Sequence, residues 1–122
     1  MDFEAAKTLC RTFPGCVEDI KWGADAVFSV GQKMFACAGA AVPADGISFK
    51  VEDERFLELT DRPGIVPAPY LARAHWVRVT DAAALGEREA GELLRRSYEL
   101  VFGKLTRKLQ KEIAESHMGA AA

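Results

Sequence analysis

Three of the five prolines lie within seven residues of one another, at Pro63, Pro67 and Pro69. Each proline fixes its own φ and lacks a backbone N–H, so the three together exclude a regular helix or a central strand. We therefore expect a stiff, extended loop that ends at His75 and Trp76. A rigid backbone that presents a polar ring and an aromatic ring is typical of a recognition surface, although it specifies no reaction.

Composition restricts the class of protein. A chain of 122 residues with 49% hydrophobic and 28% charged residues predicts one globular domain that is large enough to bury a core. Acidic residues outnumber basic ones by 18 to 16, which gives a formal net charge of −2. This balance is far from that of a dedicated nucleic-acid domain, so any anion binding must be local.

The cysteines and the apolar runs indicate the cellular setting. Cys10, Cys16 and Cys37 show no CxxC spacing, which predicts reduced, mostly buried thiols instead of a zinc site or a disulfide framework. The first residues lack the basic flank of a secretory signal, and no apolar run approaches the roughly 18 residues of a membrane span. We expect a cytoplasmic protein without membrane association.

Hydrophobic periodicity predicts an alternation of helices and short strands. The apolar residues of 2–13 recur with a helical period, and Pro14-Gly15 ends that helix. Gly31-Gln32 suits a two-residue hairpin turn whose tip carries Lys33 into solvent. We expect strands at 17–22, 26–30, 33–38, 47–51 and 75–79 and helices at 53–61 and 87–104, with helical structure that resumes through Leu109 and Ile113.

This order, α-β-β-β-β-α-β-α, predicts a two-layer α+β sandwich. An antiparallel sheet of about five strands would carry its helices on one face and leave the other face open. Residues 1–105 would form a single domain, and 106–122 a helical extension with a frayed tail. The open face is where a binding site is expected.

Short motifs follow one another in a characteristic order along most of the chain. They are Pro14-Gly15, Glu18-Asp19, Trp22-Gly23, the run from Phe28 to Phe35, Ser48-Phe49-Lys50, the run from Pro63 to Leu71, His75-Trp76 and the run from Ser97 to Val101. This order, from about residue 3 to residue 105, resembles the MmcQ/YjbR family of small bacterial proteins.

The resemblance implies a fold similar to the frataxin/CyaY type, which agrees with the element order above. It also implies DNA binding, because the family is commonly described in that way, and it brings no established reaction. Pro69 departs from the usual pattern, and residues 106–122 extend past the family core. Frataxin-like proteins bind iron along an acidic first helix, but residues 2–13 offer only Asp2 and Glu4, so iron binding is not carried over.

The expected open face combines cations with aromatic rings. Basic side chains on strands and around the proline loop suit phosphate oxygens, and neighbouring aromatic planes suit the stacking of bases. The same charges are also typical of a solvated sheet face that discourages edge pairing, and tryptophan is commonly buried. The candidate binding residues are Lys33, Lys50, Tyr70, Arg73, His75, Trp76 and Arg78.

Two functions follow from this surface. The first is a nucleic-acid-binding module that binds DNA weakly and with strong salt dependence. The alternative is a domain without catalysis that binds a small anionic ligand or docks another protein. An enzyme is less favoured, because the chain lacks GxSxG, HExxH and P-loop patterns and His75 is the only histidine in the expected fold. We predict no catalytic residue, metal or cofactor, and the sequence leaves the oligomeric state open.

Overall fold

The computed structural model describes residues 1–21, 25–39, 46–69 and 71–121, with side chains up to Ser116. Within these ranges the α-helices are α1 (Phe3–Arg11), α2 (Asp53–Thr60), α3 (Glu87–Phe102) and α4 (Arg107–Ala121), and two short 3-10 turns are η1 (Ala72–Ala74) and η2 (Ala82–Ala84). The strands are β1 (Val17–Lys21), β2 (Asp25–Val30), β3 (Lys33–Ala38), β4 (Ile47–Lys50), β5 (Ile65–Pro67) and β6 (Trp76–Val79). All of these strands belong to one antiparallel sheet in the order β1-β2-β3-β4-β6-β5.

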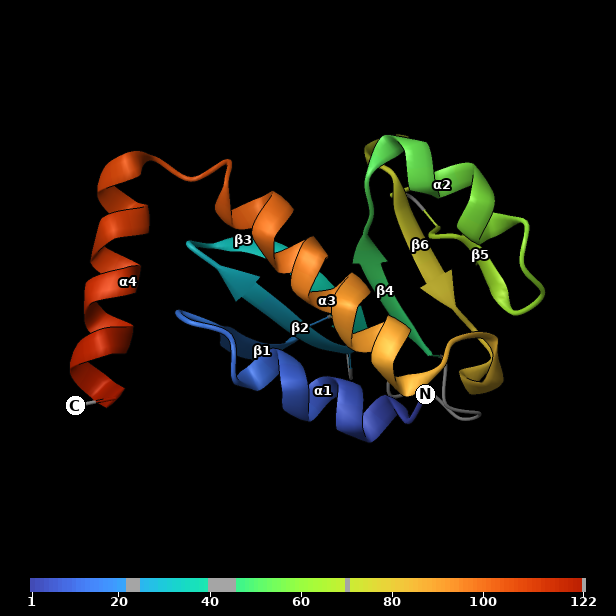
Figure 1. The fold of residues 1–122 in the computed structure, drawn as a ribbon, viewed down its shortest axis with the longest axis horizontal. Coiled ribbons are helices and arrows are strands. Elements are labelled where there is room, and N and C mark those ends of the chain that lie inside the picture. The colour runs from blue at the N-terminus through green and yellow to red at the C-terminus, as the bar shows by residue number, and fades with distance from the viewer. Residues whose placement is uncertain (22–24, 40–45, 70, 122) are drawn as a thin grey trace.

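Helices α1 and α3 lie beside each other on one face of this sheet (Figure 1). The acidic side chain of Asp2 begins α1 by accepting a hydrogen bond from the Glu4 N–H at 2.9 Å. Between the layers, the rings of Phe13, Phe35 and Tyr98 pack with centroids 5.1 to 5.9 Å apart. The other face carries no helix among the described elements, which confirms the predicted two-layer α+β architecture.

The β2–β3 hairpin turns at the predicted residues. Gly31 and Gln32 both have positive φ, 56° and 68°, as a two-residue turn of this type requires. The register then shifts, because Phe28 pairs with Ala36 while Ser29 pairs with Met34. Phe35 is therefore the extra residue of a β-bulge in β3.

A buried hydroxyl joins β3 to β4 beside this bulge. Ser97 of α3 is fully buried, and its Oγ donates to the carbonyl of Phe35 at 2.7 Å. The same Oγ accepts the backbone N–H of Lys50 at 3.0 Å. One side chain thus satisfies two backbone groups at the point where the bulge interrupts the ladder.

The proline segment holds a strand that the sequence did not predict. Residues 65–67 form β5, which pairs with β6 at the edge of the sheet and brings the strands to six where about five were expected. Proline is tolerated on an edge strand, because an N–H on the outer side has no ladder partner to lose. The exclusion of a central strand here is confirmed.

Helix α4 stands at one end of the molecule, beside the β2–β3 hairpin (Figure 1). Its apolar side approaches two glycine turns so closely that a Cβ at Gly31 would lie 3.0 Å from Leu109, and one at Gly15 would lie 2.8 Å from Ile113. The side chain of Gln110 donates to the carbonyls of Phe102 and Leu105, both at 3.0 Å, and so joins the ends of α3 and α4.

Candidate functional site

The open face of the sheet carries the candidate site. The strand register places Val27, Cys37, Ser48 and Arg78 opposite one another in a row across β2, β3, β4 and β6. Because side chains of directly paired residues share a face, all four lie on the side away from α1 and α3. Cys37, Ser48 and Arg78 of this row form the floor of a groove.

This open-face groove has a volume of about 570 Å³. Apolar groups make up most of its wall, and a few polar groups accompany them. Its lining residues are Asp25, Met34, Cys37, Ser48, Ala68, Pro69, Leu71 and Arg78.

The proline segment forms one wall of the groove because it folds back along β6. The Ala68 N–H donates to the Trp76 carbonyl at 3.0 Å, and the Trp76 N–H donates to the Leu71 carbonyl at 3.2 Å. His75 makes the turn into β6 with a φ of 60°, a left-handed conformation that is uncommon outside glycine. Backbone hydrogen bonds therefore hold the apolar side chains of this wall over the sheet.

The two charged side chains of the groove, Asp25 and Arg78, both act on the half-buried thiol of Cys37. Burial raises the pKa of the Cys37 thiol to about 11, the carboxylate of Asp25 raises it further, and the guanidinium of Arg78 opposes the shift. The thiol is therefore protonated at neutral pH and is a weak nucleophile. The Asp25 carboxylate and the Arg78 guanidinium therefore both lie near Cys37 on a mostly apolar surface.

The structure brings only part of the predicted cationic set onto this face. Lys33 pairs with Val30, a core residue, so Lys33 lies on the side of the sheet that the helices cover. Arg73 is exposed in η1, next to the groove wall, and Arg78 lies in the groove itself. Tyr70 lies outside the described residues.

Trp76 and His75 are held by the protein. Trp76 is only 5% exposed, so its ring does not offer an open plane for stacking. The Nδ1 of His75 lies 2.7 Å from Oδ1 of Asp53, and its ring meets Phe56 edge-on at 5.4 Å. His75 therefore connects the turn before β6 to the first turn of α2.

Lys50 is engaged at the same corner. Its Nζ donates to the carbonyl of Ala74 at 2.6 Å. Burial lowers the pKa of Lys50, and the nearby positive charge of Lys104 lowers it further. Lys50 thus supports the turn that carries His75.

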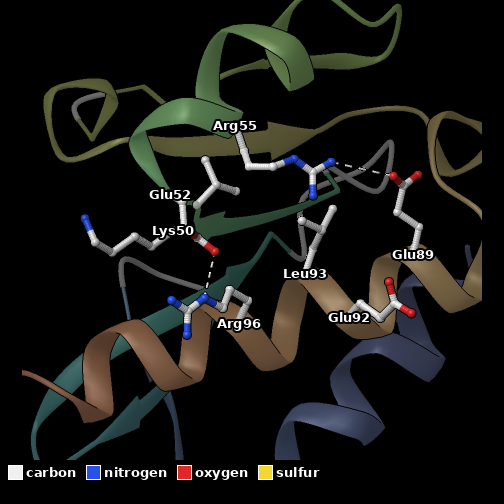
Figure 2. A pocket seen from close by; sticks show the side chains of 8 residues that line it. Lys50, Glu52, Arg55, Glu89, Glu92, Leu93 and Arg96 are labelled. Atoms are coloured by element: carbon white, nitrogen blue, oxygen red, sulfur yellow. Dashed lines mark hydrogen bonds and ion pairs between the residues drawn. The ribbon is translucent and has the colours of Figure 1, made fainter.

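A second hollow of about 210 Å³ lies between α2 and α3 (Figure 2). Its charges bind one another: Arg96 donates to Glu52 at 2.7 Å, and Arg55 lies 3.8 Å from Glu89. Arg62 adds a pair of hydrogen bonds to Glu89, at 2.7 and 3.1 Å. We interpret this hollow as a structural contact that joins α2 to α3 and not as a binding site, because its acidic and basic side chains neutralise each other.

Several residues that line the groove were not predicted from the sequence. Met34 and Leu71 were not singled out, and Cys37 was expected in the core, yet all three line the groove. The amino-acid sequence carries no signal for this placement, because Ala36, Cys37 and Ala38 are all small and apolar and only the structure shows that Cys37 alone of the three is half-exposed.

Two further properties bear on what the site can hold. Among the described residues, no three His, Cys, Asp or Glu side chains converge to form a metal site. Every helix in the same ranges falls short of the length and apolar character that crossing a bilayer requires. The lining of the groove itself offers apolar contact together with one carboxylate, one guanidinium and a hydroxyl.

The fold and the groove define a small two-layer α+β protein with one open sheet face, and comparison with known proteins shows which family it represents. A family model described as YjbR matches residues 11–100. The chain belongs to the YjbR family, which confirms the resemblance of its motifs. None of the curated proteins compared with the chain matches it.

Two solved structures share the fold. The crystal structure of the Deinococcus radiodurans protein DR2400, with a DUF419 family-model domain, is 30% identical with a TM-score of 0.79, and the match covers 91% of this chain and 86% of that one. A Pseudomonas syringae protein is 24% identical with a TM-score of 0.67, over 83% of this chain and 99% of that one. The second likeness shows the fold alone.

Proposed function

We propose that the protein is a small-molecule-binding module without catalysis and that the open-face groove is its binding site. The observation that carries this proposal is a mostly apolar hollow of about 570 Å³ that also contains a few polar groups. This volume lies within the range of about 300–1,000 Å³ that is typical of ligand pockets. The expected ligand has an apolar body and a polar end.

The arrangement of the lining supports this description of the ligand. Met34 on β3 and Leu71 on the proline wall supply apolar surface from two separate segments. Ser48 and Arg78 are direct cross-strand partners, so a hydroxyl and a guanidinium lie side by side on the floor. An anionic or strongly accepting group would bind there while the apolar body contacts the wall.

Binding of 1-anilinonaphthalene-8-sulfonate tests the proposal, because this probe combines an aromatic body with an anion. We expect a saturable rise in fluorescence with the native protein, and at least about a fivefold loss of that rise in Ser48→Trp, since the indole fills the groove floor. Thr8→Trp adds the same ring to an exposed position on α1 and is the matched control.

Thermal unfolding must show that both variants are folded, because the probe also binds partly unfolded protein. Absence of saturable binding to the native protein would contradict the proposal. Equal loss in the two folded variants would contradict it as well, because the probe would then bind elsewhere.

Nucleic acid is the second candidate ligand. The cations that favour it lie near the start of α4 and not on the open face of the sheet. Contact of the Gly31 turn with Leu109 places Lys33 beside the start of α4. There the exposed Lys104 and Arg107 and the neighbouring Lys108 have no ion-pair partner in the part of the chain that the structure describes. Clustered cations of this kind suit the phosphate backbone.

Fluorescence anisotropy with labelled single- and double-stranded DNA at several salt concentrations tests this candidate. Lys33→Ala/Lys104→Ala should reduce the slope of log affinity against log salt by about two, because two phosphate contacts are lost. Lys7→Ala/Arg88→Ala removes the same charge from residues that are already paired with acids, and should leave the slope unchanged. Binding that is absent or insensitive to salt would end this candidate.

A further inference from the structure

Strand β1 is an edge of the sheet, and no other described element covers it. All five of its residues are exposed, including Val17 at 62% and Ile20 at 60%. Among the described strands, β1 has a neighbour on one side only, which is β2. The opposite edge, β5, is three residues long and ends at Pro67, so its capacity for further pairing is small.

The direction of the backbone groups in β1 follows from one hydrogen bond. The Ile20 N–H donates to Oδ1 of its neighbour Asp19 at 2.8 Å. Because residues of an antiparallel ladder alternate between facing the partner strand and facing outward, Glu18 and Ile20 are the outward-facing residues of β1. In the single chain, the Asp19 carboxylate therefore occupies the donor that an added strand would use.

We propose that a second copy of this chain adds to β1, antiparallel and with its twofold axis at Ile20. A twofold pair brings the same edge together in opposite directions, and outward-facing residues must then lie opposite outward-facing residues. Three registers meet this condition. They place Glu18 opposite Glu18, Glu18 opposite Ile20, or Ile20 opposite Ile20 of the second copy.

Charge selects the third register. The first register sets two glutamates opposite each other, and the second sets Asp19 opposite Asp19 of the second copy. The third sets Asp19 opposite Lys21 of the second copy, twice by symmetry, and brings the two exposed Ile20 side chains together. Glu18 stays with Arg11, which binds it through two hydrogen bonds of 2.7 and 3.0 Å.

The same carboxylate then has two roles. In the single chain, Asp19 binds the Ile20 N–H and so blocks the edge. In the pair, the carbonyl of Ile20 in the second copy accepts that N–H, and the released carboxylate binds the ammonium of Lys21 in the second copy. The Ile20 N–H thus has an acceptor in both states, and the outward-facing Ile20 carbonyl gains a donor in the pair.

Sedimentation velocity on the full chain tests this proposal between roughly 10 μM and 1 mM, the range expected for a small interface. The native protein should approach twice its monomer mass as the concentration rises. Lys21→Asp sets a carboxylate opposite each Asp19 and should weaken the pair at least about tenfold. The exchange variant Asp19→Lys/Lys21→Asp should restore the pair, because the two charges only trade places.

Lys33→Asp makes the same change of charge on β3 and should leave the pair intact. Circular dichroism must show that each variant is folded. A native protein that remains a monomer throughout this range would overturn the proposal. Failure of the exchange variant to pair, or pairing of Lys21→Asp at native strength, would overturn it as well. The result does not depend on the groove, so the two proposals stand or fall separately.

Discussion

Removal of the Ser97 hydroxyl is the sharpest test of how the sheet is held at its bulge. Ser97→Ala leaves the Phe35 carbonyl and the Lys50 N–H without the partner that now lies 2.7 and 3.0 Å away. An unpaired buried backbone group costs about 1–3 kcal/mol, so two of them predict a loss of about 2–6 kcal/mol in the free energy of unfolding. This is a large part of the roughly 5–15 kcal/mol that stabilises a domain.

Urea unfolding followed by far-ultraviolet circular dichroism measures this loss. We expect a lower midpoint at an unchanged slope, and a melting temperature lower by about 10 °C or more. Ser29→Ala is the matched control, since this half-exposed hydroxyl on β2 has no hydrogen bond among the described residues, and should cost about 0.5 kcal/mol or less. A loss for Ser97→Ala that is no larger than the control would refute the bridging role.

Three other perturbations test separate parts of the structure. Gly46→Ala would place a Cβ 1.8 Å from a β6 carbonyl at a φ of +82°, so unfolding midpoints should fall by far more than for Gly86→Ala, which meets nothing within 4 Å. With its pKa raised to about 11 by burial, Cys37 should alkylate slowly at neutral pH, and mass spectrometry should show the rate rising about tenfold per pH unit up to that value. The hydrogen bond from Arg62 lowers the pKa of Glu89 from its ordinary 4.5. The stability that this ion pair contributes is therefore present above pH 4.5 and is lost as the pH falls through the lowered pKa. In urea unfolding at several pH values, Glu89→Gln should reduce the loss of stability at acid pH.

Most of the elements could be predicted because local patterns specify them. The buried residues of α3 recur at helical spacing, from Leu94 through Tyr98 to Val101, and the Gly31-Gln32 turn has the chemistry of a tight hairpin. The strand β5 was missed because its pairing partner lies on β6, and three residues ending in proline carry no pattern of their own.

The candidate site was harder to predict, and Lys33 shows why. Strict alternation from Cys37 would place both Phe35 and Lys33 on the open face. The bulge at Phe35 shifts the alternation by one residue, so that Met34 lines the groove and Lys33 lies on the helix side. A single inserted residue thus exchanges a cation for an apolar side chain at the site.

The amino-acid sequence alone determined the order of the elements, the two-layer architecture, the hairpin and the family. These depend on periodicity, turn chemistry and motif order, which are local along the chain. Only the tertiary structure decided that Leu71 and Met34 line one groove, that Trp76 is buried and that β1 is an exposed edge strand. The physical reason is that these features depend on register, on the bulge and on how the proline segment folds back, each of which joins residues that are distant in sequence.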